Sequence, residues 1–373
     1  MSGNCVIIDF VRSPLCGMGG DLKTRTVDQL AQSTLAAIMD RTKLASENLE
    51  HVIMGHAHMD TDPYNLARTA WLLTRIDENT PGYSVHGCGA SGILAMQKAY
   101  YLFKTGNDLT AIVGGAESYS YAPYIMREAR YQMDLGKFPV VDSITEGEQW
   151  TQPEPMDPRD LAKKLAEEKG YTAEELEALV AAEQERADAS LWEGYTTAVT
   201  WLDRKKKEVV MDQDAFAPAK DGFTSYVDGS VAMLMADEDR ARELGLQPVG
   251  QVLGFASAAC APDNRWESVV KAVAKLCAKH PEIEPASLTD VEVIADSAAS
   301  TKAITEGLAE QGFSAAAVNP VGGSLAYGVN EGGDGVLAAA RCLLNLRKTG
   351  GRYGIVAAAM SGGQAMAMLI EAL

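Results

Sequence analysis

The feature of this sequence that most constrains its fold is an internal repeat. Residues 99–106 and 340–350 both read as an apolar helix that closes with Lys-Thr-Gly, and each is followed by a short apolar run. Glycine after a helix marks its end, and an apolar run between such breaks is typical of a buried strand. Each strand is then expected to enter a turn of small residues, at 114–118 in one copy and at 361–364 in the other.

A second correspondence has the same order along the chain. Residues 45–54 resemble residues 285–294, and both follow an amphipathic helical pattern, at 27–43 and at 267–280. Buried strands that alternate with helices favour sheets covered on both faces. The two correspondences together predict a duplicated α/β unit.

Residues 118–228 have no counterpart in the second copy. They contain a helical pattern at 160–168 and a helix start at Thr172, which has Glu175 three residues later as in a capping box. We expect a helical and loop subdomain laid on the duplicated body. The predicted division is an N-terminal half at 1–117 plus about 229–250, the inserted subdomain at 118–228 and a C-terminal half at 251–373.

The composition limits the partners that this chain can have. Its 373 residues carry a net charge of −18, which repels nucleic acid and anionic membrane surfaces. No apolar run is long enough to span a membrane, and the N-terminus lacks the features of a signal peptide, so we expect a cytoplasmic protein. The six cysteines have no metal-ligand spacing, which predicts reduced thiols and no metal site. The basic run at 204–207 is interpreted as a solvated turn rather than an anion site.

Several motifs go beyond the repeat, and they occur in a fixed order over essentially the whole chain. They are Val11-Arg12-Ser13-Pro14 with Gly17 and Gly19-Gly20, residues 114–124, residues 174–187, Val318-Asn319-Pro320 with Gly322-Gly323 and Gly328, and residues 361–364 with Ala367-Met368. Together they resemble the thiolase superfamily, which includes acetyl-CoA acyltransferases and 3-ketoacyl-CoA thiolases. The resemblance implies the thiolase fold, in which two duplicated halves form five αβαβα layers with an inserted helical and loop subdomain.

The resemblance also implies a chemistry, which belongs to the acyltransferase class. In this family a cysteine at a helix N-terminus takes the acyl group of an acyl-CoA, a histidine acts as base, a second cysteine moves a proton and an asparagine completes an oxyanion hole. All four catalytic positions are altered in this chain. The matching residues are Gly89 for the nucleophile, Ala295 for the asparagine, Val329 for the histidine and Ala359 for the second cysteine.

The remaining candidate residues are polar groups near these positions. Cys88 lies one residue before the nucleophile position and is either a displaced nucleophile or a packing residue. Thr224 and Ser225 stand where the family contacts coenzyme A, although the same segment also reads as an ordinary turn. The further pocket candidates are His56, His86, Asn319, Tyr327, Asn330 and Glu331. No covalently bound cofactor is expected; coenzyme A or acyl-CoA is the expected substrate or ligand.

Three functions follow from these observations. In the first, the chain is the non-catalytic subunit of a heteromeric thiolase, in a dimer or tetramer with an active paralogue, and the complex forms or thiolytically cleaves a β-ketoacyl-CoA. In the second, the chain is itself an acyltransferase that uses Cys88. In the third, it is a thiolase-fold lyase that cleaves carbon–carbon bonds without an acyl-cysteine.

Overall fold

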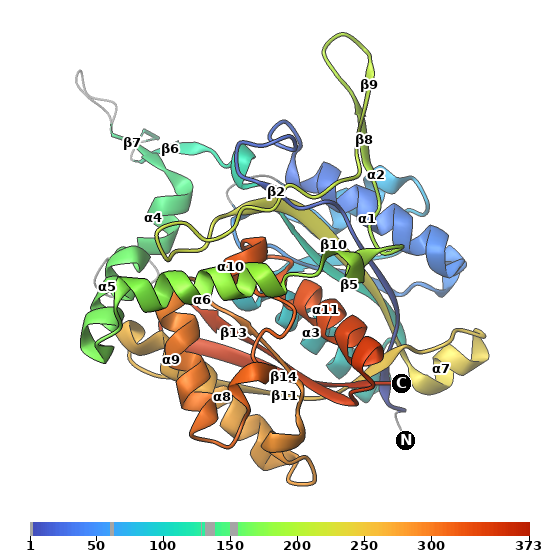
Figure 1. Cartoon of the computed structure of the whole chain (residues 1–373). Helices are drawn as coiled ribbons and strands as arrows, with labels where there is room; N and C mark the ends of the chain where they lie inside the picture. The colour runs from blue at the N-terminus through green and yellow to red at the C-terminus, as the bar shows by residue number, and fades with distance from the viewer. Residues whose placement is uncertain (1–2, 60–62, 128, 131–138, 150–155) are drawn as a thin grey trace.

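The computed structural model describes residues 3–59, 63–127, 129–130, 139–149 and 156–373 (Figure 1). Its centre is a ten-stranded sheet with the order β12-β13-β14-β11-β1-β10-β5-β3-β4, and the short β2 pairs with β10. The strands are β1 (Cys5–Arg12), β2 (Cys16–Gly17), β3 (His51–Gly55), β4 (Gly82–Val85), β5 (Thr110–Glu117), β10 (Val227–Asp237), β11 (Gly250–Ala259), β12 (Asp290–Ile294), β13 (Tyr353–Met360) and β14 (Gln364–Ala372).

The sheet repeats one pattern of strand pairing. In the first half β3 is parallel to β5, β5 is antiparallel to β10, and β10 is antiparallel to β1. In the second half β12 is parallel to β13, β13 is antiparallel to β14, and β14 is antiparallel to β11. The halves join where β1 pairs with β11 over Cys5, Val6 and Ile7. The duplicated α/β unit predicted from the repeat is therefore confirmed.

Helices form three layers around and between these two halves (Figure 1). Helices α1 (Val27–Thr42) and α2 (Leu66–Thr74) cover the outer face of the first half, and α8 (Arg265–Lys279) and α9 (Ala298–Ala309) cover the outer face of the second. Helices α3 (Ser91–Thr105) and α11 (Asp334–Thr349) lie between the halves, and their apolar side chains join both in one core. The five predicted layers are present.

The chain between β5 and β10 adds elements of its own. They are β6 (Tyr124–Met126), β7 (Val140–Asp142), α4 (Ser143–Gln149), α5 (Pro158–Lys169), α6 (Ala173–Arg186), β8 (Val199–Leu202) and β9 (Glu208–Met211). Helix α6 begins at the predicted capping box of Thr172 and Glu175, and both α5 and α6 pack against α9. The division of the chain at residues 117, 228 and 250 stays a prediction.

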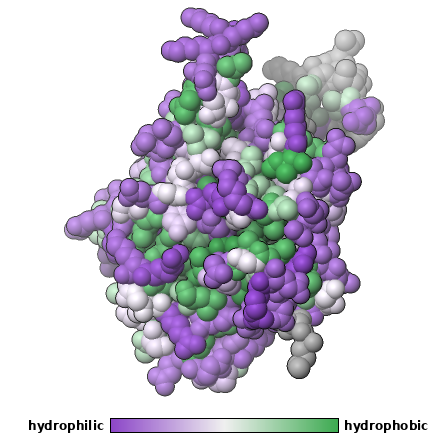
Figure 2. Space-filling view, turned by 90° about the vertical axis from the view of Figure 1, so that its right-hand side faces the viewer, coloured by the Kyte–Doolittle hydropathy of each residue, from purple (hydrophilic) through white to green (hydrophobic). Residues whose placement is uncertain are grey.

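The basic run at 204–207 forms the tip of the β8–β9 hairpin. All four of its residues are exposed, and Figures 1 and 2 show the hydrophilic tip standing clear of the body. The carboxylate of Asp203 accepts hydrogen bonds from the main-chain N–H groups of Lys205 and Lys207, and these two bonds stabilise the turn.

One of the two predicted small-residue turns is wrong. Residues 361–364 do turn the chain between β13 and β14, with Gly362 and Gly363 at positive φ. Residues 114–117, in contrast, continue β5. The glycines serve close packing there, because a Cβ atom on Gly115 would lie 1.9 Å from the carbonyl oxygen of Gly332. The missing side chain lets the loop before α11 rest on the strand.

None of the helices in the described ranges is long and apolar enough to cross a membrane.

Candidate active site

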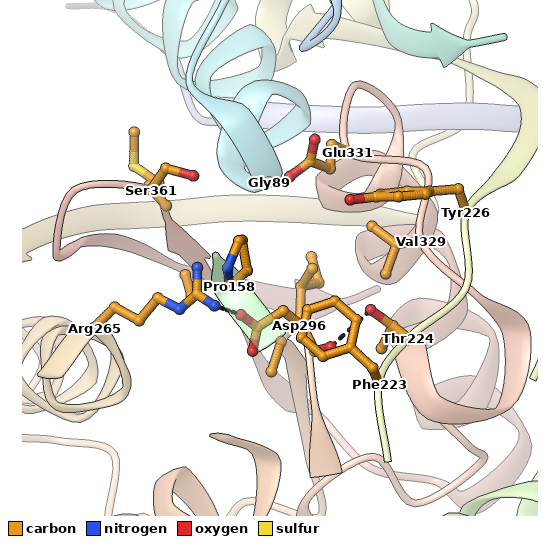
Figure 3. Close-up of a pocket in the computed structure, with 14 residues that line it drawn as sticks. Gly89, Pro158, Phe223, Thr224, Tyr226, Arg265, Asp296, Val329, Glu331 and Ser361 are labelled. Carbon is orange, nitrogen blue, oxygen red and sulfur yellow. Dashed lines mark hydrogen bonds and ion pairs between the residues drawn. The ribbon is translucent and has the colours of Figure 1, made fainter. Parts of the chain in front are cut away.

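A cavity of about 60 Å³ lies where the two halves meet (Figure 3). The four residues predicted to stand at the family's catalytic positions all line it. Gly89 comes from the short 3-10 helix Cys88–Ala90 before α3, Ala295 follows β12, Val329 precedes α11 and Ala359 lies near the end of β13. The fold thus brings together four positions that are up to 270 residues apart (359 − 89), yet their side chains offer no nucleophile, base or hydrogen-bond donor.

Main-chain pairing fixes the loop that carries Val329. The Val329 N–H donates to the carbonyl of Ser225 at 2.8 Å, and the Val227 N–H donates to the carbonyl of Val329 at 2.9 Å. The segment 225–227 therefore forms one wall of the cavity together with Val329. Tyr226 lies on this wall.

An ion pair forms the opposite side of the cavity. The Arg265 guanidinium at the start of α8 contacts the carboxylate of Asp296, and Figure 3 shows the pair across from Glu331. The hydroxyl of Thr224 donates to the carbonyl oxygen of Asp296 at 2.9 Å. These contacts tie α8, the end of β12 and the segment before β10 to one another.

Glu331 is the second carboxylate on the cavity wall. Its Oε2 lies 3.1 Å from Nε2 of His58 and 3.5 Å from the hydroxyl of Tyr119. The Glu331 N–H donates to the same Tyr119 hydroxyl at 3.2 Å. Tyr119 in turn stacks on Tyr226, with ring centroids 4.3 Å apart. Glu331 therefore reaches the cavity with its carboxylate held by aromatic and imidazole groups.

A buried acid–histidine pair lies behind this wall. His56 Nε2 is 3.6 Å from Glu117 Oε2, and both side chains are fully buried. Burial raises the pKa of Glu117 to about 8, although the charge of His58 and the N–H of Ala57 oppose the rise. Burial, with the charges of His58 and His86, lowers the pKa of His56 to about 4. At neutral pH both members of the pair are neutral.

Strand direction explains why these groups gather. β3 lies between β4 and β5 and is parallel to both, so the carboxyl ends of the three strands lie at the same edge of the sheet. His56 and His58 follow β3, His86 follows β4, and Glu117 ends β5. His56 and His86 were predicted from the sequence, whereas His58, Glu117 and the cavity residues Tyr226 and Arg265 were not. The position of His58 and Glu117 at the ends of predicted strands was the signal that could have indicated them.

Cys88 is not among the residues that line the cavity. It is half-buried with a positive φ of 47°, and its carbonyl accepts the hydroxyl of Ser91. Its neighbour Gly89 faces the cavity instead. The exposed His86 makes a long contact with the carbonyl of His56, 3.3 Å from Nδ1.

Three other candidates make structural contacts away from the cavity lining. Asn319 accepts a hydrogen bond from the Val293 N–H at 2.8 Å and donates one to the carboxylate of Glu183. These two bonds connect β12 to α6. Tyr327 donates to the carbonyl of Val321 at 2.6 Å. Asn330 donates to the carbonyls of Val227 and Gly229, at 3.0 and 3.2 Å. These side chains hold the loops that shape the cavity.

An open groove of about 900 Å³ adjoins the cavity and shares Phe223, Thr224 and Tyr226 with it. Thr224 and Ser225 both line the groove. Three cationic side chains, Arg159, Lys163 and Lys220, line it together with one acid, Asp221, and Lys163 also pairs with Asp160 at 3.2 Å. A strongly acidic protein therefore presents local positive charge beside its cavity. Among the described residues no group of acidic, histidine and cysteine side chains could hold a metal ion.

The fold and this cavity define an α/β protein of two duplicated halves with its candidate site between them. Comparison with known proteins identifies the family. The model of the thiolase N-terminal domain matches residues 5–223, and that of the thiolase C-terminal domain matches residues 246–372. The chain belongs to the thiolase family.

Similar proteins cover the full length of the chain. An acetyl-CoA acetyltransferase of Thiocystis violacea is 26% identical over 100% of both chains, and a beta-ketoadipyl-CoA thiolase of Pseudomonas knackmussii is 29% identical over 100% of both. The crystal structure of the Bacillus anthracis acetyl-CoA acetyltransferase superposes with a TM-score of 0.92 at 25% identity, and the match covers 100% of this chain and 99% of that one.

Proposed function

We propose that this chain binds an acyl-CoA ester and works in acyl-CoA metabolism as a thiolase subunit that does not itself form an acyl-cysteine. In a dimer or tetramer it would complete an active paralogue, and the complex would form or thiolytically cleave a β-ketoacyl-CoA. One observation carries the proposal. The four positions predicted to match the family's reactive groups, Gly89, Ala295, Val329 and Ala359, all line one cavity and carry no reactive side chain.

The groove supports the coenzyme A part of this proposal. Coenzyme A is anionic through its phosphates, and Arg159, Lys163 and Lys220 supply positive charge along the groove. Thr224 and Ser225 would contact the pantetheine arm where the groove meets the cavity. The acyl end would then enter the cavity between Tyr226 and Asp296.

Binding and acylation can be measured separately on the purified chain. Calorimetry with coenzyme A should show saturable binding, and mass spectrometry after incubation with acetyl-CoA should show no covalent adduct. Thiolase activity should appear only when an active paralogue is present. An acetyl group on Cys88 that disappears in Cys88→Ser would overturn the proposal in favour of a displaced nucleophile, although the place of Cys88 outside the cavity lining argues against that outcome.

A lyase that cleaves carbon–carbon bonds without an acyl-cysteine is the second candidate. The carboxylate of Glu331 on the cavity wall favours it, because such a reaction needs a base and no nucleophile.

A further inference from the structure

We propose that Glu331 is the general base of a retro-aldol cleavage of a β-hydroxyacyl thioester in this cavity, with His58 as its positioning residue. This inference rests on the proposal that groove and cavity take a CoA ester. It goes beyond that proposal because it assigns the chain a reaction of its own.

Glu331 is suited to this role by its place and its contacts. Of the two carboxylates that line the cavity, Asp296 is neutralised by the guanidinium of Arg265, whereas Glu331 is held by an imidazole 3.1 Å away. The Glu331 side chain is 21% exposed. Figure 3 shows it beside Gly89, on the same side of the cavity as the hydroxyl of Tyr226. A carboxylate so placed can reach a ligand while its other contacts fix its orientation.

The route into the cavity sets which part of the ligand meets Glu331. The groove and the cavity share Phe223, Thr224 and Tyr226, so a thioester that enters from the groove passes these residues first. Its acyl carbons then lie against Gly89, Val329 and Glu331. Glu331 can therefore exchange protons with groups on the carbons next to the thioester.

The surrounding charges keep Glu331 ionised. Burial raises the pKa of Glu331, but the hydrogen bond and charge of His58, with the charges of His86 and Arg265, outweigh burial and hold this pKa below its usual value. The charge of Glu331 in turn raises the pKa values of Glu117, Asp334 and the Tyr119 phenol. A ligand that displaces water from the cavity strengthens the carboxylate as a base, since desolvation disfavours its charge.

The reaction balances with Glu331 alone as proton carrier. Glu331 takes the proton of the β-hydroxyl group, the Cα–Cβ bond breaks, and the β-carbon becomes a carbonyl. The electron pair of the broken bond becomes the thioester enolate, whose Cα then takes the proton back from Glu331. The products are an aldehyde or ketone and a shortened CoA ester. The hydroxyl of Tyr226 is the donor placed to hold the enolate oxygen.

The test uses the full chain and a series of 3-hydroxyacyl-CoA esters, from short to long acyl chains, with the carbonyl product and the shortened CoA ester measured by mass spectrometry. We expect both products in equal amounts. Glu331→Gln should lower kcat by about 10²–10⁴-fold with little change in binding. Glu282→Gln is the matched control, because Glu282 also pairs with a histidine, His280 at 3.2 Å, but on an exposed surface; it should keep full activity.

The failures of the two proposals are distinguishable. If coenzyme A does not bind, the proposed function fails. If every ester of the series binds but none is cleaved, or if Glu331→Gln cleaves at the wild-type rate, the assignment of Glu331 is overturned while the binding proposal stands. His58→Gln provides an independent readout, since loss of the imidazole raises the pKa of Glu331 and should move the acidic limb of the kcat/KM profile to higher pH; an unmoved limb would contradict the role of His58.

Discussion

At the scale of single residues, four side chains decide which chemistry the cavity cannot perform. Gly89, Ala295, Val329 and Ala359 line it without a reactive group. The backbone has also adapted at one of them, because a Cβ atom on Gly89 would lie 2.8 Å from the carbonyl oxygen of Ala359. A cysteine could not simply be returned to that position without a local shift.

Restoring a single catalytic side chain should therefore fail. Val329→His puts a histidine at the position predicted for the family's base, but the positions predicted for the nucleophile, the second cysteine and the asparagine still carry no reactive group, and groups that act as a unit are strongly non-additive. We expect no thiolase activity from Val329→His in a thiolysis assay with acetoacetyl-CoA. If the chain works beside an active paralogue, the rate of the complex should also stay nearly unchanged. A large change in either direction would show that this chain's own pocket performs the acyl transfer.

The buried pair of His56 and Glu117 gives a prediction about stability and pH. The pKa of Glu117 is about 8 in the folded state, so its protonated form stabilises the fold. This contribution to the unfolding free energy is fully present below the ordinary pKa of a glutamate and is lost as the pH rises through 8. His56 titrates at about 4 in the fold and near 6.5 when unfolded, so it no longer contributes above pH 6.5. Between pH 6.5 and 8 the wild-type chain should lose about 1.5 kcal/mol more unfolding free energy than Glu117→Gln.

Urea unfolding at several pH values between these limits measures that difference directly. Asp334, whose pKa burial raises to about 7, is present in both proteins and its effect cancels. Parallel curves for the wild type and Glu117→Gln would contradict the burial of Glu117 as an uncharged acid.

At the scale of elements, the site depends on how closely β5 approaches the loop before α11. That loop carries both Val329 and Glu331, and it rests on the glycine at position 115. Helix α11 continues from the loop and is buried along most of its length. The position of the cavity wall is therefore set by a contact between two backbones.

Gly115→Ala should disturb this contact strongly. The new methyl group would meet the Gly332 carbonyl carbon and oxygen within 2.3 Å, so the loop must move, and we expect a loss of about 3 kcal/mol in unfolding free energy. Gly147→Ala in α4 is the control, since nothing lies within 4 Å of its added Cβ; it should be neutral or slightly stabilising. Equal stability of the two variants would show that the loop can move freely.

At the scale of the whole molecule, one edge of the sheet is left open in the described part of the chain. Strand β4 ends the sheet on one side. Apolar side chains are exposed on the nearby helices, with Leu72 at 42%, Leu73 at 39% and Tyr101 at 53%. Open strand edges and exposed apolar patches are features that assembly covers. They support the prediction of a dimer-based assembly, whereas a paralogue as the partner stays a prediction.

The edge can be tested with one residue. The carbonyl of Pro81 accepts a hydrogen bond from Val52 in β3, and that of Val85 accepts one from His56 directly after β3, so by alternation the main-chain groups of Ser84 face away from β3. Ser84→Pro removes that outward N–H without breaking a bond to β3, and it should turn a dimer into a monomer in sedimentation at micromolar concentration. Ser84→Thr keeps the N–H and should remain dimeric. A wild-type chain that is monomeric alone and with its paralogue would refute the predicted assembly.

The duplicated α/β architecture could be predicted from the sequence, because hydrophobic periodicity and glycines at helix ends are local signals that occur twice in the same order. The motif spacing also predicted the four altered positions, and their match to the family's catalytic residues stays a prediction. Other features depend on residues that are far apart in the sequence. Glycines 114 and 115 lie in a strand rather than a turn because they pair with Met54 and Gly55 of β3 and with Ala232 and Val231 of β10, and both strands are distant in the sequence. Likewise, the contact of Glu331 with His58 and Tyr119 depends on the edge where parallel strands end, and no local pattern in the sequence records which side chains meet there.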